Sequence, residues 1–171
     1  MIVVRKEMPD DIAAIWKINE KAFGQPVEAN IVDKLRENCS DLLSLVAVQE
    51  EQIVGHILFS PARIEGEGKR VEGVGLAPMA VLPTFQRHGI GSRLVQEGIN
   101  MQKNRGSPFV VVLGHPEFYP RFGFQRASDH GIRSQWDGIP DEAFMILLLN
   151  PAAMAGTSGT ARYRDEFDEA M

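Results

Sequence analysis

The chain has 171 residues and a formal net charge of −5, with 44% hydrophobic and 24% charged residues. This balance is typical of a globular protein and excludes disordered and fibrous chains. The acidic surplus argues against a general nucleic-acid binder, which carries a basic surplus instead.

The cysteine content and the lengths of the apolar runs indicate where in the cell the protein is expected. The single cysteine, Cys39, excludes an internal disulfide and a cysteine-rich zinc site. The N-terminus becomes charged at Arg5 and is not a secretory signal. The longest apolar runs, 42–48 and 144–149, have strand length and are too short to span a bilayer. We therefore expect a cytoplasmic protein with no metal, membrane or nucleic-acid partner.

The hydrophobic pattern predicts a chain of mixed strands and helices. Pro9-Asp10-Asp11 opens a helix in which apolar residues recur at helical spacing, and Gly24 ends it. The expected elements, in chain order, are strand 2–4, the helix to Phe23, helix 28–38, strands 43–48, 53–64 and 70–82, helix 91–104, strand 109–113, and strands beginning at Phe124 and Phe144.

The strand over 70–82 is irregular and leads into a distinctive loop. Gly73, Gly75 and Pro78 interrupt it, which is typical of a bulge or an edge. Gln86-Arg87-His88-Gly89-Ile90-Gly91-Ser92 then precedes a helix. Free amides at a helix start, the helix dipole and glycines without a Cβ together form a site suited to a phosphate. Without a third glycine or a following Gly-Lys-Ser/Thr, it matches neither common nucleotide signature.

A second motif follows one strand later, at Glu117-Phe118-Tyr119-Pro120-Arg121-Phe122-Gly123-Phe124. Its phenylalanines are typical of a loop packed under a sheet. Tyr119 differs because its hydroxyl needs a polar partner if buried and donates a hydrogen bond if it lines a cleft.

These two motifs, in this order, resemble the GNAT superfamily of N-acetyltransferases. The resemblance covers 74–124 and includes the strand end Met79-Ala80-Val81-Leu82-Pro83, the Q-x-x-G-x-G loop and the Y-x-R-x-G-F motif. Residues 114–119 resemble a branch whose members mostly have no assigned substrate. The implied fold is α/β (mixed α+β), with a central mixed, mostly antiparallel sheet that splays between strands four and five and has helices on both faces. We expect residues 1–150 to form a single domain and residues 151–171 to form a surface appendage.

The resemblance also implies an activity and a set of site residues. Acetyl-CoA would donate its acetyl group to a primary amine of a small molecule or peptide by direct attack in a ternary complex. Tyr119 would stabilise the departing CoA thiolate, and homodimers are common in the family. The cofactor-binding positions would be Met79, Ala80 and Val81 for the pantetheine arm, and Arg87, His88, Gly89, Ile90, Gly91 and Ser92 for the pyrophosphate.

Two departures from the family pattern leave alternatives open. His115-Pro116 stands where many members have an asparagine that contacts CoA, and the strand before Leu82 lacks a carboxylate that some relatives use as a base. A non-catalytic acyl-CoA-binding or regulatory module on the same fold is therefore the alternative function. The candidates for the general base are Glu72, His115, Glu117, His56 and water.

Overall fold

The computed structural model describes every residue from Met1 to Met171. The chain divides into two compact units, each built from separate stretches of sequence. Unit 1 contains residues 1–59, 77–98 and 165–171, and unit 2 contains residues 60–76 and 99–164.

Unit 1 is built on antiparallel strands. Strand β1 pairs with β2 and β2 with β3, in a register that places Ile2 opposite Gln49 and Leu43 opposite Phe59. The elements that begin in this unit are β1 (Ile2–Lys6), α1 (Ile12–Phe23), α2 (Val27–Asn38), β2 (Leu43–Gln49), β3 (Gln52–Gly66) and α3 (Ile90–Asn104).

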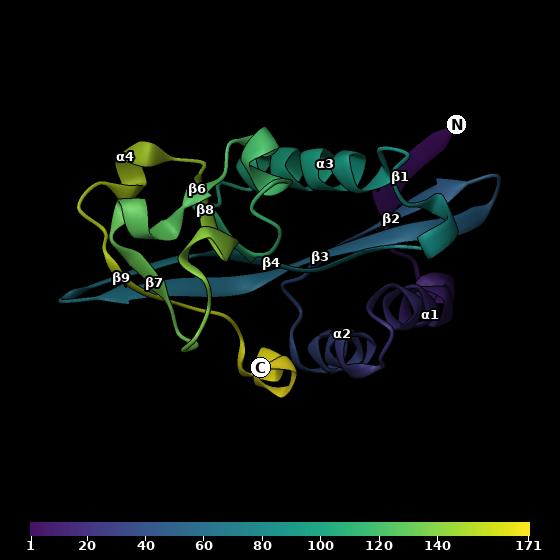
Figure 1. The fold of residues 1–171 in the computed structure, drawn as a ribbon, viewed down its shortest axis with the longest axis horizontal. Helices are drawn as coiled ribbons and strands as arrows, with labels where there is room; N and C mark the ends of the chain where they lie inside the picture. The colour runs from purple at the N-terminus through teal and green to yellow at the C-terminus, as the bar shows by residue number, and fades with distance from the viewer. The chain divides into compact units, whose positions relative to one another are not determined.

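Helices cover both faces of β3 in unit 1. Since side chains alternate along a strand, neighbouring residues of β3 contact different helices. Gly55 and Phe59 face α3, where a Cβ added at Gly98 would lie 2.2 Å from the Phe59 ring. His56 points to the opposite face, and its Nδ1 lies 3.1 Å from the Asn19 amide nitrogen of α1. Figure 1 shows α3 on one side of these strands and α1 and α2 on the other. The expected helices on both faces are therefore confirmed.

Unit 2 holds the remaining strands. The complete strand order is β1-β2-β3-β4-β5-β8-β6, and β9 pairs with both β3 and β7. The β4–β5 and β7–β9 pairs are parallel, whereas the other registered pairs are antiparallel. The elements are β4 (Lys69–Val81), β5 (Phe109–Leu113), β6 (Gln125–Arg126), β7 (Ile132–Ser134), β8 (Phe144–Leu148), α4 (Pro151–Met154) and β9 (Gly159–Arg162).

The parallel pairing of β4 with β5 is short. It joins Val74–Leu76 of β4 to Val110–Val112 of β5 and ends there. Residues 77–81 complete β4 in unit 1 and include Pro78, which has no amide to donate to a neighbouring strand. The fold class, including a mostly antiparallel sheet that opens between strands four and five, agrees with the sequence prediction.

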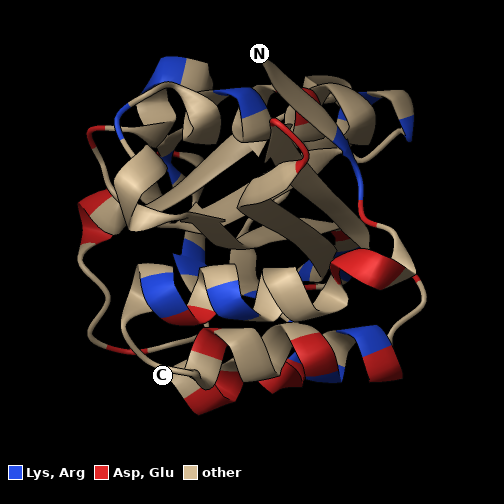
Figure 2. Ribbon diagram, turned by 90° about the vertical axis from the view of Figure 1, so that its right-hand side faces the viewer, with Lys and Arg blue, Asp and Glu red and all other residues tan.

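The C-terminal residues differ from the expected surface appendage. Tyr163 and Phe167 are buried, and β9 extends the sheet between β3 and β7. In unit 1 the C-terminal 3-10 turn, Asp165–Ala170, packs on α2, where Lys34 forms an ion pair with Glu169. Figure 2 shows acidic segments gathered at this end of the chain. Residues 151–171 are rich in Gly, Ser, Thr and charged residues, which predicts an exposed segment, although every second residue from 157 to 163 is buried.

The structure also bears on membrane association. None of its helices combines the length and apolarity that a bilayer crossing requires.

Candidate active site

The predicted phosphate loop forms one continuous run of free amides in unit 1. A 3-10 turn, Pro83–Phe85, follows β4, and α3 begins at Ile90. The backbone hydrogen bonds of this region use the amides of Phe85, Gln86 and Arg93, but none between Arg87 and Ser92. Since the first amides of a helix have no acceptor within it, these groups are available to an anion.

Backbone conformation and one side chain hold this loop. Arg87 and Gly89 have φ values of 66° and 80°, in the left-handed region that glycine adopts without strain. The Gln86 side-chain amide donates to the Val81 carbonyl at 3.0 Å and ties the loop to the end of β4. Gln86 belongs to the predicted motif, but its bond to Val81 is not evident from the sequence. The predicted cofactor positions Met79, Ala80 and Val81 therefore lie at the end of the strand to which Gln86 connects the loop.

The two arginines near the loop differ in what they contact. Arg93 donates to the Ile2 carbonyl at 2.5 Å, so this guanidinium is engaged with β1. Arg87 lies within the run of free amides, and its side chain is exposed. Any charge-assisted contact with a bound anion is thus expected from Arg87 rather than from Arg93.

Tyr119 lies in unit 2 at the start of a 3-10 turn, Tyr119–Phe122, after β5. Its ring contacts Phe118 and Phe124 edge-on, with centroids 5.0 and 5.6 Å away. The ring also lies against Gly114, where an added Cβ would approach within 2.5 Å of Cε2. These contacts fix the ring, and no hydrogen bond of the structure uses its hydroxyl.

Burial keeps this phenol protonated. Tyr119 is 6% exposed, and desolvation raises the pKa of its hydroxyl to about 12. Because the phenolate is disfavoured, Tyr119 is a hydrogen-bond donor across the physiological pH range. An unpartnered donor held in a fixed orientation is suited to stabilise an anion formed next to it.

The candidates for the base occupy different environments. Glu72 is exposed and pairs with Arg70 at 2.7 Å. His115 and Glu117 are exposed in the loop that carries Tyr119. His56 is fully buried, and both of its ring nitrogens contact protein groups. The structure thus removes His56 from the groups accessible to an acceptor amine.

His56 belongs to a buried hydrogen-bond chain in unit 1. The Asn19 amide donates to the Ile15 carbonyl at 3.0 Å, which fixes its orientation and directs its other N–H to His56 Nδ1 at 3.1 Å. Nδ1 is therefore an acceptor, and Nε2–H donates to Ser44 Oγ at 2.9 Å. Ser44 in turn donates to Glu7. The chain links α1, β3 and β2 and requires a neutral imidazole.

Protonation of His56 should therefore destabilise the folded protein. Burial lowers its pKa from 6.5 to about 4. Between these pH values the unfolded chain binds a proton that the folded protein excludes, so stability present above pH 6.5 is lost as the pH falls to 4. The loss should reach about 3 kcal/mol. The pKa of Glu7 is lowered despite its burial, because Arg36 and Ser44 bond to it, so its contribution is lost at lower pH.

Chemical denaturation of the wild type and His56→Gln between pH 7 and 4 tests this expectation. Glutamine retains an N–H donor for Ser44 but does not titrate. The wild-type free energy of unfolding should fall more steeply than that of the variant, by about 1.4 kcal/mol per pH unit. His88→Gln, at an exposed position, should keep the wild-type slope. Parallel curves for the wild type and His56→Gln would contradict the assignment.

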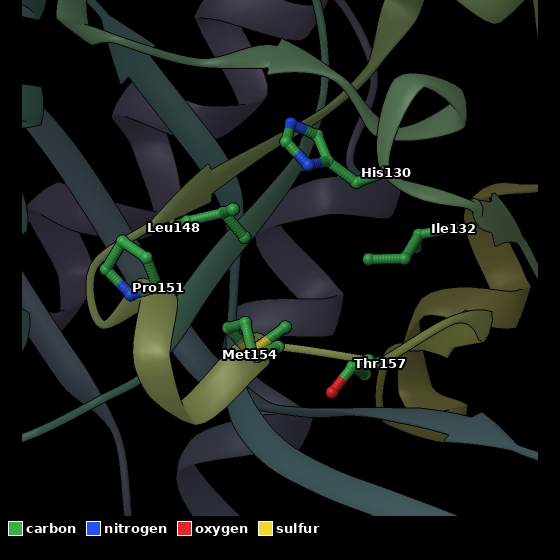
Figure 3. Close-up of a pocket in the computed structure, with 8 residues that line it drawn as sticks. His130, Ile132, Leu148, Pro151, Met154 and Thr157 are labelled. Atoms are coloured by element: carbon green, nitrogen blue, oxygen red, sulfur yellow. The ribbon is translucent and has the colours of Figure 1, made fainter.

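A separate pocket of about 270 Å³ lies within unit 2. Figure 3 shows His130, Ile132 and Leu148 around it, with Met154 of α4 opposite His130. His130 Nε2 lies 2.7 Å from Gln125 Oε1. None of the predicted site residues lines this pocket.

Comparison with known proteins identifies the family. Residues 3–127 match the family described as the acetyltransferase (GNAT) domain. The chain belongs to the GNAT family. Two uncharacterized N-acetyltransferases of Escherichia coli resemble this GNAT protein. YhbS is 35% identical over 168 residues, covering 98% of this chain and 99% of YhbS. YjhQ is 41% identical over 135 residues, covering 77% and 74% of the two chains.

Solved structures agree with this membership. The crystal structure of E. coli YhbS in complex with CoA has a TM-score of 0.91 and covers 98% of this GNAT chain and 92% of that one, at 35% identity. A GNAT acetyltransferase of Brucella melitensis in complex with acetyl-CoA has a TM-score of 0.79 and covers 98% and 99%, at 34% identity.

Proposed function

We propose that this protein transfers the acetyl group of acetyl-CoA to a primary amine of a small molecule or peptide, by direct attack in a ternary complex. The observation that carries the proposal is the run of free amides from Arg87 to Ser92 at the start of α3. The proposal is further supported by family membership and by relatives whose structures contain CoA or acetyl-CoA.

Coenzyme binding would rest on backbone groups. The pyrophosphate would accept hydrogen bonds from the amides of the loop, where the dipole of α3 adds favourable potential. The pantetheine arm would pair with the backbone of Met79, Ala80 and Val81, which lie beyond the end of the β4–β5 pairing. Side-chain identity at Met79 and Val81 matters less in this arrangement than their peptide groups.

The acetyl transfer requires a neutral amine and a donor for the developing oxyanion. An alkylammonium with a pKa near about 10.4 must lose its proton before the nitrogen attacks the thioester carbonyl. The carbonyl oxygen gains negative charge in the tetrahedral intermediate, and a β4 amide near Val81 would donate to it. Collapse of the intermediate forms the amide and breaks the bond to sulfur.

Tyr119 would then stabilise the CoA thiolate by hydrogen bonding. Its pKa of about 12 lies well above the reference thiol value of about 8.5, so full proton transfer to sulfur is uphill by about 5 kcal/mol. A short hydrogen bond from the phenol to the thiolate supplies stabilisation without that transfer. A non-catalytic binding module would have no use for this donor beside the thioester sulfur, so thiol release distinguishes the two functions.

The structure reduces the number of candidates for the base that accepts the proton of the acceptor amine. His56 is buried, and both of its ring nitrogens are engaged. Glu72, His115, Glu117 or water would therefore accept the proton. His115 and Glu117 lie in the loop that carries Tyr119, and Glu72 is exposed beside Arg70.

Two measurements on the wild-type protein test the function. Calorimetry should detect CoA binding, and a thiol-release assay with acetyl-CoA and a panel of diamines, amino acids and lysine peptides should detect turnover. Binding of CoA without thiol release for any amine would favour the non-catalytic alternative. Absence of CoA binding would overturn both functions.

A further inference from the structure

Tyr163, the only tyrosine besides Tyr119, lies at the end of the β4–β5 pairing in unit 2. Its hydroxyl donates to the Val111 carbonyl at 3.0 Å and lies 3.4 Å from the Leu76 carbonyl. Leu76 belongs to the last pair of the parallel register, opposite Val112. The phenol therefore contacts both strands where their pairing stops.

The hydroxyl reaches one carbonyl from each strand. Val111 belongs to β5 and Leu76 to β4, and both residues stand in the last two pairs of the register, Gly75 with Val111 and Leu76 with Val112. Burial raises the pKa of Tyr163, so the hydroxyl remains a hydrogen-bond donor. The phenol therefore lies across the two strands at the end of their pairing.

Close packing holds the ring in this position. A Cβ added at Gly75 would lie 2.5 Å from Cε2 of Tyr163, so only glycine accommodates the ring against β4. Trp136 lies on the ring with centroids 5.5 Å apart, and the Tyr163 amide donates to Gln135 Oε1 at 2.6 Å. The ring is 3% exposed. Because the ring is fixed by neighbours on several elements, the hydroxyl holds a fixed position at the end of the β4–β5 pairing.

Tyr163 and Tyr119 contact the same end of β5, because the Tyr163 hydroxyl bonds to the Val111 carbonyl and the Tyr119 ring lies against Gly114, directly after the strand. Both side chains lie in unit 2, and each packs on a glycine, Gly114 for Tyr119 and Gly75 for Tyr163. The residue at the end of the strand pairing and the residue assigned to the thiolate therefore share one environment.

We infer that Tyr163 is a positioning residue for acetyl transfer, whose hydroxyl fixes the end of the β4–β5 pairing and thereby aligns the thioester with Tyr119. The inference rests on the proposed function. Tyr163 is assigned no contact with the coenzyme, because its ring is buried and its hydroxyl contacts backbone carbonyls of the protein. Its loss should impair the chemical step and leave coenzyme affinity intact.

Tyr163→Phe removes the hydroxyl and keeps the ring. Without the hydroxyl, the Val111 and Leu76 carbonyls lose the donor that lies between the two strands, and the end of the pairing shifts. Since a displacement of about 1 Å can cost about 10²-fold in rate, kcat should fall about tenfold or more. The Kd of CoA, measured by calorimetry, should stay within about twofold of the wild-type value.

A double-mutant cycle separates positioning from general destabilisation. If Tyr163 acts through the alignment with Tyr119, its removal in a Tyr119→Phe background should change kcat by less than about threefold, because coupled residues are not additive. Ile132→Val, a buried change on β7 in the same unit, is the matched control for lost stability. It should leave kcat unchanged in both backgrounds.

Gly75→Ala provides a second variant that retains the hydroxyl. The new Cβ displaces the ring, and kcat should fall while CoA binding shows that the protein is folded. Wild-type kcat in Tyr163→Phe, or an equal loss in both backgrounds, would overturn the inference alone. A wild-type protein that neither binds CoA nor releases thiol would overturn the proposed function, and the inference with it.

Discussion

Replacing Gly89 by glutamate should weaken CoA binding by about 10³-fold. Gly89 has a φ of 80°, and a side chain there loses about 1–2 kcal/mol in the left-handed conformation that presents the free amides. The carboxylate also repels a diphosphate at about 1–4 kcal/mol for a separation near 4 Å. Calorimetric titration with CoA measures the combined effect directly.

Gly106→Glu is the matched control for this substitution. Gly106 has a φ of 83° and follows the C-terminal end of α3, and no heavy atom lies within 4 Å of an added Cβ at either glycine. The two variants therefore share backbone strain, side-chain space and charge, but only one alters the loop of free amides. CoA binding within about threefold of wild type is expected for Gly106→Glu. Normal affinity in Gly89→Glu would contradict the placement of the pyrophosphate.

Local pattern was sufficient for most elements of the fold. The predicted strand 109–113 and helix 91–104 agree with β5 and α3 to within a residue, because apolar periodicity and terminal glycines report local structure directly. The glycine loop before α3 was predictable for the same reason. Its amides are free because of where a helix begins, and that boundary is visible in the sequence.

The C-terminal strand was not predictable in the same way. Strand β9 has four residues and pairs with Ile132–Ser134 and with Arg63–Glu65, both distant in sequence. The buried positions Gly159 and Ala161 of the strand, and Tyr163 directly after it, alternate with polar ones, but the segment is too short to outweigh the surrounding glycines and polar residues. The alternation of residues 159, 161 and 163 with polar residues is the local sign that this segment is partly buried.

The contacts of His56 and Tyr163 required the three-dimensional structure for a different reason. Each depends on hydrogen bonds between residues of several elements, as in the chain from Asn19 through His56 to Ser44. Sequence identifies the donors and acceptors but not which of them meet. It therefore left His56 among the candidate bases, whereas the structure shows both ring nitrogens engaged.

Tyr119→Phe should lower kcat by about 10²- to 10³-fold, the usual cost of removing one donor to a developing anion. Phenylalanine preserves the ring contacts with Phe118 and Phe124, so the loop should keep its conformation. The Kd of CoA should change little, because the free amides that bind the pyrophosphate are untouched. An equal loss of turnover and CoA affinity would contradict the assigned role.

The pH dependence of the wild type distinguishes hydrogen bonding from proton transfer by Tyr119. Burial raises the pKa of this phenol to about 12, so it remains a donor as the pH rises and its function would be lost only near that value. Between pH 7 and about 10, the kcat profiles of the wild type and of Tyr119→Phe should therefore have the same shape. Any decline in kcat over this range should be present in both proteins. A decline in the wild type that Tyr119→Phe abolishes would mean that Tyr119 ionises near the pKa of the thiol, and proton donation to sulfur would then replace stabilisation of the thiolate as its role.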